Sequence, residues 1–253
     1  MAYPAGYMEL SLGRDLPLLK EVLHAGFVTH AQLFELMQFA GLESCCEAFN
    51  WRVKRLVTHE FLVRHELQGF GRNFVYSVGP NGALHLTSHG ESCAAMVAGF
   101  VARRDAPRVA HSVDVTAIRL HLLRAGLLKE WLSEFDIRAR NDLTSYGYAK
   151  DYDSIMTLAI CGHEVKVALE YERQPKAMKR YSKIRAVIER ERRVSRFLYL
   201  FPDYKLLWFV HGLFRKAAPK LYFGLVSELE RDLLQARVVD PQMRFVTLET
   251  ALQ

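Results

Sequence analysis

The chain has 253 residues, of which 50% are hydrophobic and 25% charged, and its formal net charge is +6. That length allows one large domain or two small ones, each with its own core. No apolar stretch approaches the ~20 residues that cross a bilayer, and the N-terminus lacks the pattern of a secretory signal. The four cysteines form no C-x-x-C pair, which argues against a zinc site or a disulfide framework. We therefore expect a cytoplasmic protein with no membrane association.

Two helices are predicted near the start of the chain. Asp15 is placed to cap the first, and Gly26 is placed to end it. Thr29 and Gln32 have the spacing of a capping box for the second, which Gly41 ends.

A third helix and a hairpin follow. Ser44 and Glu47 are spaced as another capping box, at the start of "CCEAFNWRVKRLVTHE". Four apolar residues of this helix share one face: Phe49, Val53, Leu56 and Val57. The next segments, "FLVRHEL" and "FVYSV", predict two strands, and the glycines of "QGFGRN" between them allow a tight turn.

Three short helices and a two-stranded wing resemble a winged helix-turn-helix domain. The resemblance implies that the third helix enters the major groove of duplex DNA and that the wing touches its backbone or minor groove. The DNA-contacting residues that it implies are Arg52, Lys54, Arg55 and His59 on the helix, and Arg72 and Asn73 on the wing. The alternative is that the same domain docks another protein of a replication or conjugation complex.

A domain boundary is predicted at "ARRDAPRVA", which is polar, contains a proline and lacks periodicity. We therefore expect a first domain over residues 1–101, a linker over 102–110 and a second domain over 111–253. A short connecting helix is expected near 89–102.

The second domain alternates predicted helices and strands. In chain order we expect a helix in "HSVDVTAIRLHLLRAGLLKEWL", a short strand in "SEFDIRAR", a loop in "NDLTSYGYAKDY", strands in "DSIMTLAIC" and "EVKVALEYE", a helix in "QPKAMKRYSKIRAVIERERRVSRF", a strand in "KLLWFV", a helix in "GLVSELERDLLQAR" and a last strand in "MRFVTLE". This order predicts a mixed sheet with helices on its faces, in an α/β (α+β) fold.

Acidic and basic residues concentrate around the two central strands. Asp153 opens the first of them, and strand alternation places Glu170 and Glu172 on one face of the second. The segment 173–196 then carries ten Lys and Arg against two acids, a local charge of +8, of the kind that phosphate backbones attract. Either the carboxylates hold a metal ion beside a phosphate, or they only neutralise this basic surface.

The strand order and these acids resemble the core of restriction-endonuclease-like nucleases. The resemblance implies a site with Asp153 on the second core strand, Glu170 and Glu172 at the end of the third, and Glu134 as an early acid. Glu134, Asp153 and Glu170 would bind Mg²⁺ or Mn²⁺, which polarises the scissile phosphate. The chain departs from the family where Glu172 replaces the expected lysine, and Lys176 or Lys179 is the candidate replacement.

Taken together, the two halves resemble the replication-relaxation family of plasmids and mobile elements. The motifs are the winged-helix N-terminus, "HSVDVTAIRLHL", "WLSEFDIR", the Asp-led strand and "ALEYERQPKAMKRY". The resemblance implies a regulator of transcription or an accessory protein that binds double-stranded DNA as a homodimer, with Lys183 and its basic neighbours adding phosphate contacts. It leaves open a metal-dependent endonuclease that uses Asp153 and Glu170, although a non-catalytic DNA binder is favoured.

Overall fold

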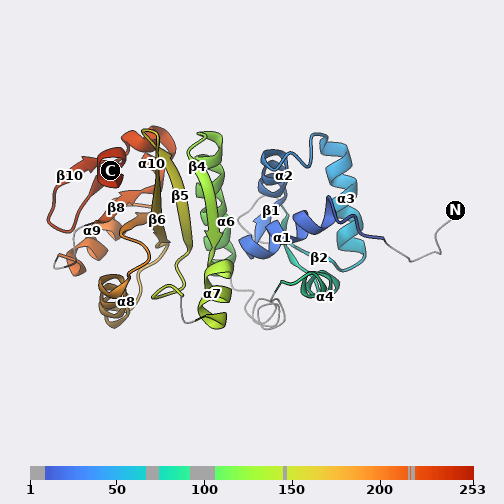
Figure 1. Ribbon diagram of the computed structural model, residues 1–253, viewed down its shortest axis with the longest axis horizontal. Helices are drawn as coiled ribbons and strands as arrows, with labels where there is room; N and C mark the ends of the chain where they lie inside the picture. Colours follow the sequence, from blue (N-terminus) through green and yellow to red (C-terminus); the bar gives the residue numbers. More distant parts are fainter. Residues whose placement is uncertain (1–8, 67–73, 92–105, 145–146, 216, 218–219) are drawn as a thin grey trace. The chain divides into compact units, whose positions relative to one another are not determined.

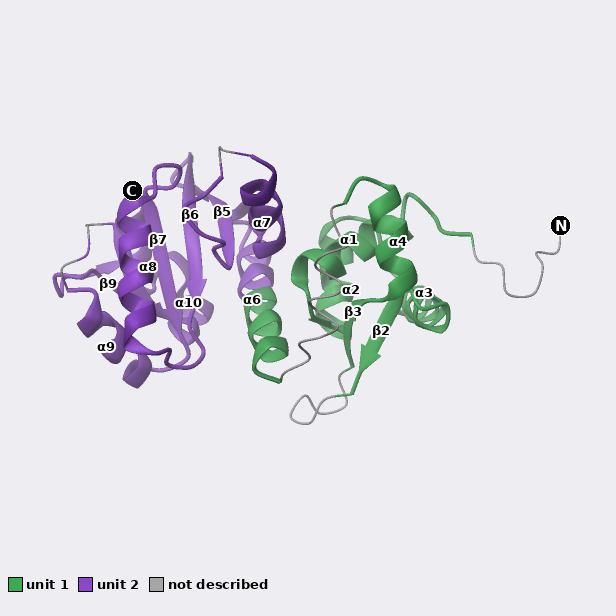
Figure 2. Ribbon diagram, turned by 90° about the horizontal axis from the view of Figure 1, so that it is seen from below, with its two compact units in different colours: residues 1–117 green, residues 118–253 purple. Residues whose placement is uncertain are grey.

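The computed structural model describes residues 9–66, 74–91, 106–144, 147–215, 217 and 220–253. The chain divides into two compact units, residues 1–117 and 118–253 (Figure 2). Helix α6 (Ala106–Arg124) begins in the first unit and ends in the second. It starts inside the segment that we expected to be a linker, because Pro107 is tolerated in the first turn of a helix. No helix of the described residues is both long and apolar enough to cross a membrane.

The first unit combines helices with a small sheet (Figure 1). Its further elements are α1 (Asp15–Ala25), β1 (Val28–Thr29), α2 (His30–Phe39), α3 (Cys46–Thr58), β2 (Leu62–His65), β3 (Val75–Val78) and α4 (Pro80–Ser88). The three strands form an antiparallel sheet in the order β1-β3-β2, which confirms the predicted hairpin and adds the short strand β1.

The helix boundaries of this unit agree with the predicted caps in three of five places, one of which is Gly41, which follows the C-cap of α2 with a φ of +68°. Thr29 and Gln32 form the expected capping box of α2, and Gly26 ends α1 with a φ of +73°. The prediction for Asp15 was wrong, because α1 begins at Asp15 itself and its carboxylate accepts from the Ser11 N–H. The box expected before α3 was also wrong, because Cys45 is the N-cap and makes no side-chain capping bond.

Helix α4 lies earlier in the chain than the connecting helix expected near 89–102, most of which falls outside the described residues. Pro80 occupies its first turn, where the missing N–H costs nothing. Gly79 and Gly82 pack against the backbone of Glu60 and Phe61, so that a Cβ at either position would clash with a carbonyl oxygen. The two glycines therefore allow α4 to follow the hairpin closely.

The second unit is a mixed sheet with helices. Its elements after α6 are β4 (Leu128–Ser133), α7 (Glu134–Leu143), β5 (Ser154–Ile160), β6 (His163–Tyr171), α8 (Met178–Arg190), β7 (Arg196–Phe201), α9 (Tyr204–Leu213), β8 (Leu221–Leu225), α10 (Val226–Asp232), a 3-10 turn (Leu233–Gln235), β9 (Arg237–Val239), β10 (Phe245–Thr247) and α11 (Leu248–Leu252). The seven strands lie in the order β10-β9-β8-β7-β6-β5-β4.

The centre of this sheet has two kinds of connection. Strands β4, β5 and β6 form an antiparallel meander, with a bulge in β4 between Leu128 and Glu130. Strands β6, β7 and β8 are parallel, and α8 and α9 make the two connections that parallel pairing requires. Aromatic rings of Tyr199, Phe201 and Phe223 stack across β7 and β8 in the buried core.

Several segments of this unit differ from the prediction. The helix expected over 174–197 ends at Arg190, its last two residues belong to β7, and strands β8 and β9 were not predicted. The long helix expected over 111–132 ends at Arg124, because Gly126 adopts a φ of +67° and the chain continues as β4. The segment "SEFDIRAR", expected as a strand, is helix α7, since Ser133 and Asp136 form a capping box at its start. The segment "KLLWFV", also expected as a strand, belongs to α9, whose first turn is capped by Asp203.

Candidate functional site

Helix α3 has a buried face and an exposed face. Phe49, Val53 and Leu56 are buried at helical spacing, as the sequence predicted. The residues that remain exposed on the helix include Glu47, Asn50, Trp51, Lys54 and Thr58. The exposed face therefore offers polar groups and one large aromatic ring rather than a uniformly basic surface.

Arg52 does not lie on the exposed face, and this corrects the sequence-based expectation. It is only 8% exposed and is held in two ion pairs, with Asp15 at 2.9 Å and Glu43 at 2.6 Å. Arg55 donates to the other oxygen of the fully buried Asp15 at 2.7 Å and lies over the ring of Trp51. The physical reason is that two buried carboxylates need cations, so both arginines fix α3 to the rest of the unit.

Lys54 is exposed, so it is accessible for the DNA contact that the sequence predicted. The remaining residues predicted to contact DNA are His59, Arg72 and Asn73. His59 follows the end of α3, is half-buried, and its carbonyl accepts from the side chain of Asn81. Arg72 and Asn73 lie outside the described residues.

A groove of about 1010 Å³ lies between α3 and the β2–β3 hairpin. Its floor is apolar, and its polar groups come from both walls. It is lined by His30, Asn50, Val53, Lys54, Val57, Thr58, Glu60, Leu62, Val63, Arg64, Phe74, Tyr76 and Pro80.

Polar contacts fix one end of this groove. The imidazole of His30 bonds the Tyr76 hydroxyl at 3.2 Å and the Asn50 side chain at 2.7 Å, so it joins α2, α3 and β3. Arg64 lies on β2 over the ring of Phe74, at 4.4 Å from the centroid. Neither His30 nor Arg64 was singled out from the sequence, although His30 directly follows the capping Thr29.

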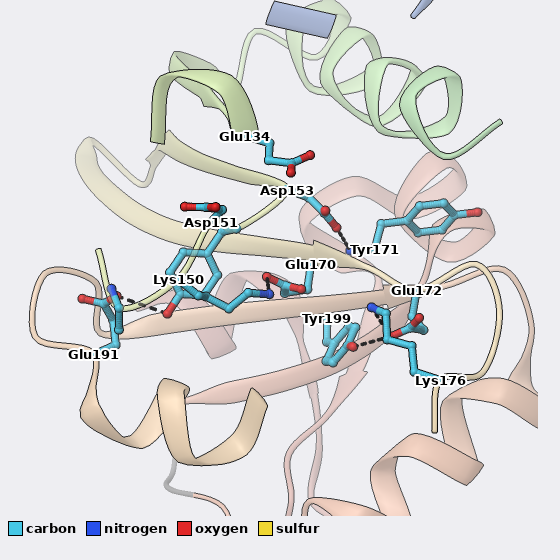
Figure 3. A network of polar contacts seen from close by, with 12 residues as sticks. Glu134, Lys150, Asp151, Asp153, Glu170, Tyr171, Glu172, Lys176, Glu191 and Tyr199 are labelled. Carbon is cyan, nitrogen blue, oxygen red and sulfur yellow. Dashed lines mark hydrogen bonds and ion pairs between the residues drawn. The ribbon is translucent and has the colours of Figure 1, made fainter. Parts of the chain in front are cut away.

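The second group of candidate residues surrounds the start of β5 and the end of β6 (Figure 3). Antiparallel pairing of Ser154 with Leu169 brings Asp153 beside Glu170, as the sequence predicted. A carboxylate oxygen of Asp153 accepts the Tyr171 N–H at 2.6 Å. Asp153 thus has a structural role at the junction of the two strands, whatever else it contacts.

Glu170 is buried and forms an ion pair with Lys150 (Figure 3). Burial raises the pKa of Glu170 to about 7, the ammonium of Lys150 opposes this shift, and the charge of Asp153 adds to it. Burial acts against the charge of Lys150, but Glu170 and Asp153 outweigh it and raise the pKa of that ammonium. Lys150 therefore stays charged while Glu170 titrates close to neutral pH.

Glu172 is also buried, and its carboxylate is satisfied by two donors. The Tyr199 hydroxyl donates at 2.6 Å and Lys176 at 2.8 Å (Figure 3). Burial, together with the charges of Glu170 and Glu172, raises the pKa of Tyr199, which remains a neutral donor. Lys176 therefore does contact the cluster, whereas Lys179 is exposed on α8.

Glu134 stands at the start of α7 and pairs with Arg138 at 2.6 Å. It lies close enough to Lys150 to add to the raised pKa of that ammonium. The three acids predicted to hold a metal, Glu134, Asp153 and Glu170, are thus arranged around a lysine. No three His, Cys, Asp or Glu side chains of the described residues are placed to bind a metal ion. As they stand, these residues do not form a ready site for Mg²⁺ or Mn²⁺, because the Glu170 carboxylate is paired with Lys150 and the Asp153 carboxylate accepts the Tyr171 N–H.

Lys150 and Tyr199 are the members of the cluster that sequence reasoning missed. Lys150 lies in a segment expected to be a loop. The only sequence signal for its place in the cluster is its position three residues before Asp153. Tyr199 lies opposite Glu170 in the parallel pairing of β6 and β7.

Helix α8 contains Lys183 and carries five of the ten Lys and Arg residues of the basic segment 173–196. Tyr181, Ile184 and Ile188 are buried, and the exposed cations of the helix are Lys179, Arg180, Lys183 and Arg190.

Comparison of the chain with protein-family models, with curated proteins and with solved structures finds no match.

Proposed function

We propose that the chain is a DNA-binding protein whose first unit is a winged helix-turn-helix domain. The order of its elements supports this assignment: a helix, a short strand, two helices and a hairpin, with the short strand paired to the hairpin. In such a domain α3 enters the major groove and the β2–β3 hairpin is the wing. The observation that carries the proposal is that α3 and the hairpin line one groove, to which both contribute polar side chains, among them Lys54 and Arg64.

The geometry changes which residues we assign to DNA contact. Lys54 and Asn50 project from α3 into the groove and Arg64 reaches it from β2, so these three are the candidates for phosphate and base contacts. Arg52 and Arg55 are instead committed to Asp15 and Glu43. The two arginines hold α3 in place. They affect DNA binding only by fixing the position of this helix.

We propose further that the second unit has a restriction-endonuclease-like core that is not catalytic. The antiparallel meander β4-β5-β6, followed by β7 parallel to β6 after a helix, has the strand order of that core. Lys150 neutralises Glu170, one of the three carboxylates that a nuclease would use for a metal ion, and Lys176 pairs with Glu172, which stands at the position of the family's lysine. The resemblance to the replication-relaxation family then favours a regulator or accessory protein of a plasmid or mobile element, acting in the cytoplasm as a homodimer.

The test is binding of the full chain to duplex DNA, measured by fluorescence anisotropy at low salt. A Lys54→Ala/Arg64→Ala variant should bind at least about tenfold more weakly, because two cations leave the groove. Lys129→Ala/Lys205→Ala removes the same charge from exposed positions of the second unit and should bind like the parent. Absence of duplex binding by the parent, or equal losses in both variants, would refute the proposal.

A metal-dependent endonuclease is the second candidate, because Asp153 and Glu170 do lie side by side. It is tested with Mg²⁺ or Mn²⁺ on supercoiled plasmid, beside Asp153→Asn, which keeps an acceptor for the Tyr171 N–H. Metal-dependent nicking that disappears in this variant, with DNA binding retained, would make the second unit an enzyme. We expect no nicking by either protein.

A further inference from the structure

Helix α8 has a face of exposed positive charge, unpaired within the described residues, that the first unit's groove does not explain. Three cations, Lys179, Lys183 and Arg190, fall within a narrow sector of the helix at 3.6 residues per turn. This sector lies opposite the buried Tyr181 and Ile188. Over eleven residues the row extends for about 16 Å along the helix.

These cations form no ion pair with any carboxylate in the described part of the protein. Lys179, Lys183 and Arg190, and also the neighbouring Arg180, are exposed, and within the described residues none of the four takes part in an ion pair. By contrast, Arg185 of the same helix is paired with Glu189. Arg185 is thus neutralised within the helix, whereas the charges of the three-residue row and of the neighbouring Arg180 face solvent.

We propose that this row binds the phosphate backbone of a nucleic acid, independently of the groove in the first unit. A row of fixed cations suits a polymer with regularly spaced negative charges, since each contact releases condensed counterions.

An anionic membrane surface is the competing partner, and the packing of α8 argues against it. Interfacial helices insert an apolar face among the lipids. The apolar face of α8, formed by Tyr181, Ile184 and Ile188, is already buried in the protein core. Only Met178 is a large exposed apolar residue on this helix. The helix therefore offers charge without an insertable face.

The experiment compares two variants of the full chain with equal net charge. The first replaces the three cations of the row and the neighbouring Arg180 with glutamine: Lys179, Lys183, Arg190 and Arg180. The matched control replaces four exposed cations of other elements of the second unit with glutamine: Lys129, Arg140, Lys166 and Lys205. Affinities for a duplex DNA and a duplex RNA of random sequence are measured by anisotropy between 50 and 200 mM salt.

If four phosphate contacts are lost, the slope of log K against log salt for duplex DNA should become shallower by about 3 to 4 in the first variant only. The parent should then lose about 100-fold more affinity than this variant over the salt range. Equal losses of affinity for DNA and for RNA support a contact with the phosphate backbone that both share. A loss of affinity for one of them alone identifies which nucleic acid the row binds.

The inference is overturned if the first variant keeps the parent's affinity and slope, or if the control loses as much. It is also overturned if the first variant loses only binding to vesicles of phosphatidylserine and phosphatidylcholine. If the α8 variant loses affinity for DNA and Lys54→Ala/Arg64→Ala does not, DNA binding by the groove is refuted and phosphate binding by α8 is supported.

Discussion

Removing Arg52 should unfold the first unit rather than weaken a direct DNA contact. In Arg52→Ala, the carboxylates of Asp15 and Glu43, which are 0% and 8% exposed, lose their donors at 2.9 and 2.6 Å. Asp15 retains Arg55 and the Ser11 N–H, but Glu43 is left as a buried charge without a described side-chain donor. Breaking a buried pair in this way costs about 3 to 5 kcal/mol.

The assay is urea denaturation of the full chain, followed by circular dichroism, with Lys54→Ala as the control. Lys54 is exposed, so its removal should change the free energy of unfolding by less than about 0.5 kcal/mol and yet weaken DNA binding. Arg52→Ala should instead lower the free energy of unfolding. The part of that protein that remains folded should bind DNA with the parent's affinity. Arg52→Lys, which keeps the charge but not the planar fork, should fall between alanine and the parent in stability. An Arg52→Ala protein with the parent's stability and no DNA binding would refute the reasoning.

Further expectations concern pH, helix caps and glycines. Because burial raises the pKa of Glu170 from 4.5 to about 7, its contribution to stability is complete below pH 4.5 and is lost as pH rises through 7. Glu170→Gln should therefore reduce the fall in Tm between pH 4.5 and 7.5. Asp203→Ala should cost about 1 kcal/mol in urea denaturation, since its carboxylate caps α9 at the Leu206 N–H. In the same assay Gly212→Ala, in open space on α9, should stabilise by about 0.5 to 1 kcal/mol, whereas Gly82→Ala should destabilise because its Cβ would meet a carbonyl.

Local signals predicted much of the first unit and the two strands β5 and β6 of the second. The Thr29 capping box, the apolar period of α3 and the glycines before β3 are all encoded within a few residues. Alternation along β6 was enough to place Glu170 beside Asp153, because two consecutive strands joined by a short turn pair in antiparallel fashion.

The failures have equally specific causes. In the segment of α7, apolar Phe135 and Ile137 alternate with polar residues, which is the pattern of a strand. The segment is nevertheless a helix, and the capping box at Ser133 stabilises its first turn. Arg52 looks like a surface residue by type, but its partner Asp15 lies 37 residues away in the chain. Lys150 meets Glu170 through the fold of a loop that has no periodicity to read. Contacts of this kind depend on tertiary packing, which a local pattern does not contain.

The bulge in β4 has a consequence for how this protein behaves at high concentration. β4 lies at one edge of the seven-stranded sheet, where unpaired backbone groups invite a strand from another molecule. The irregular step between Leu128 and Glu130 breaks the regular ladder, and Lys129 within the step and Glu130 at its end are exposed and charged. At the opposite edge β10 has only three residues. Both margins of the sheet thus discourage edge-to-edge aggregation, which keeps a large, aromatic-rich sheet from acting as a template for fibres.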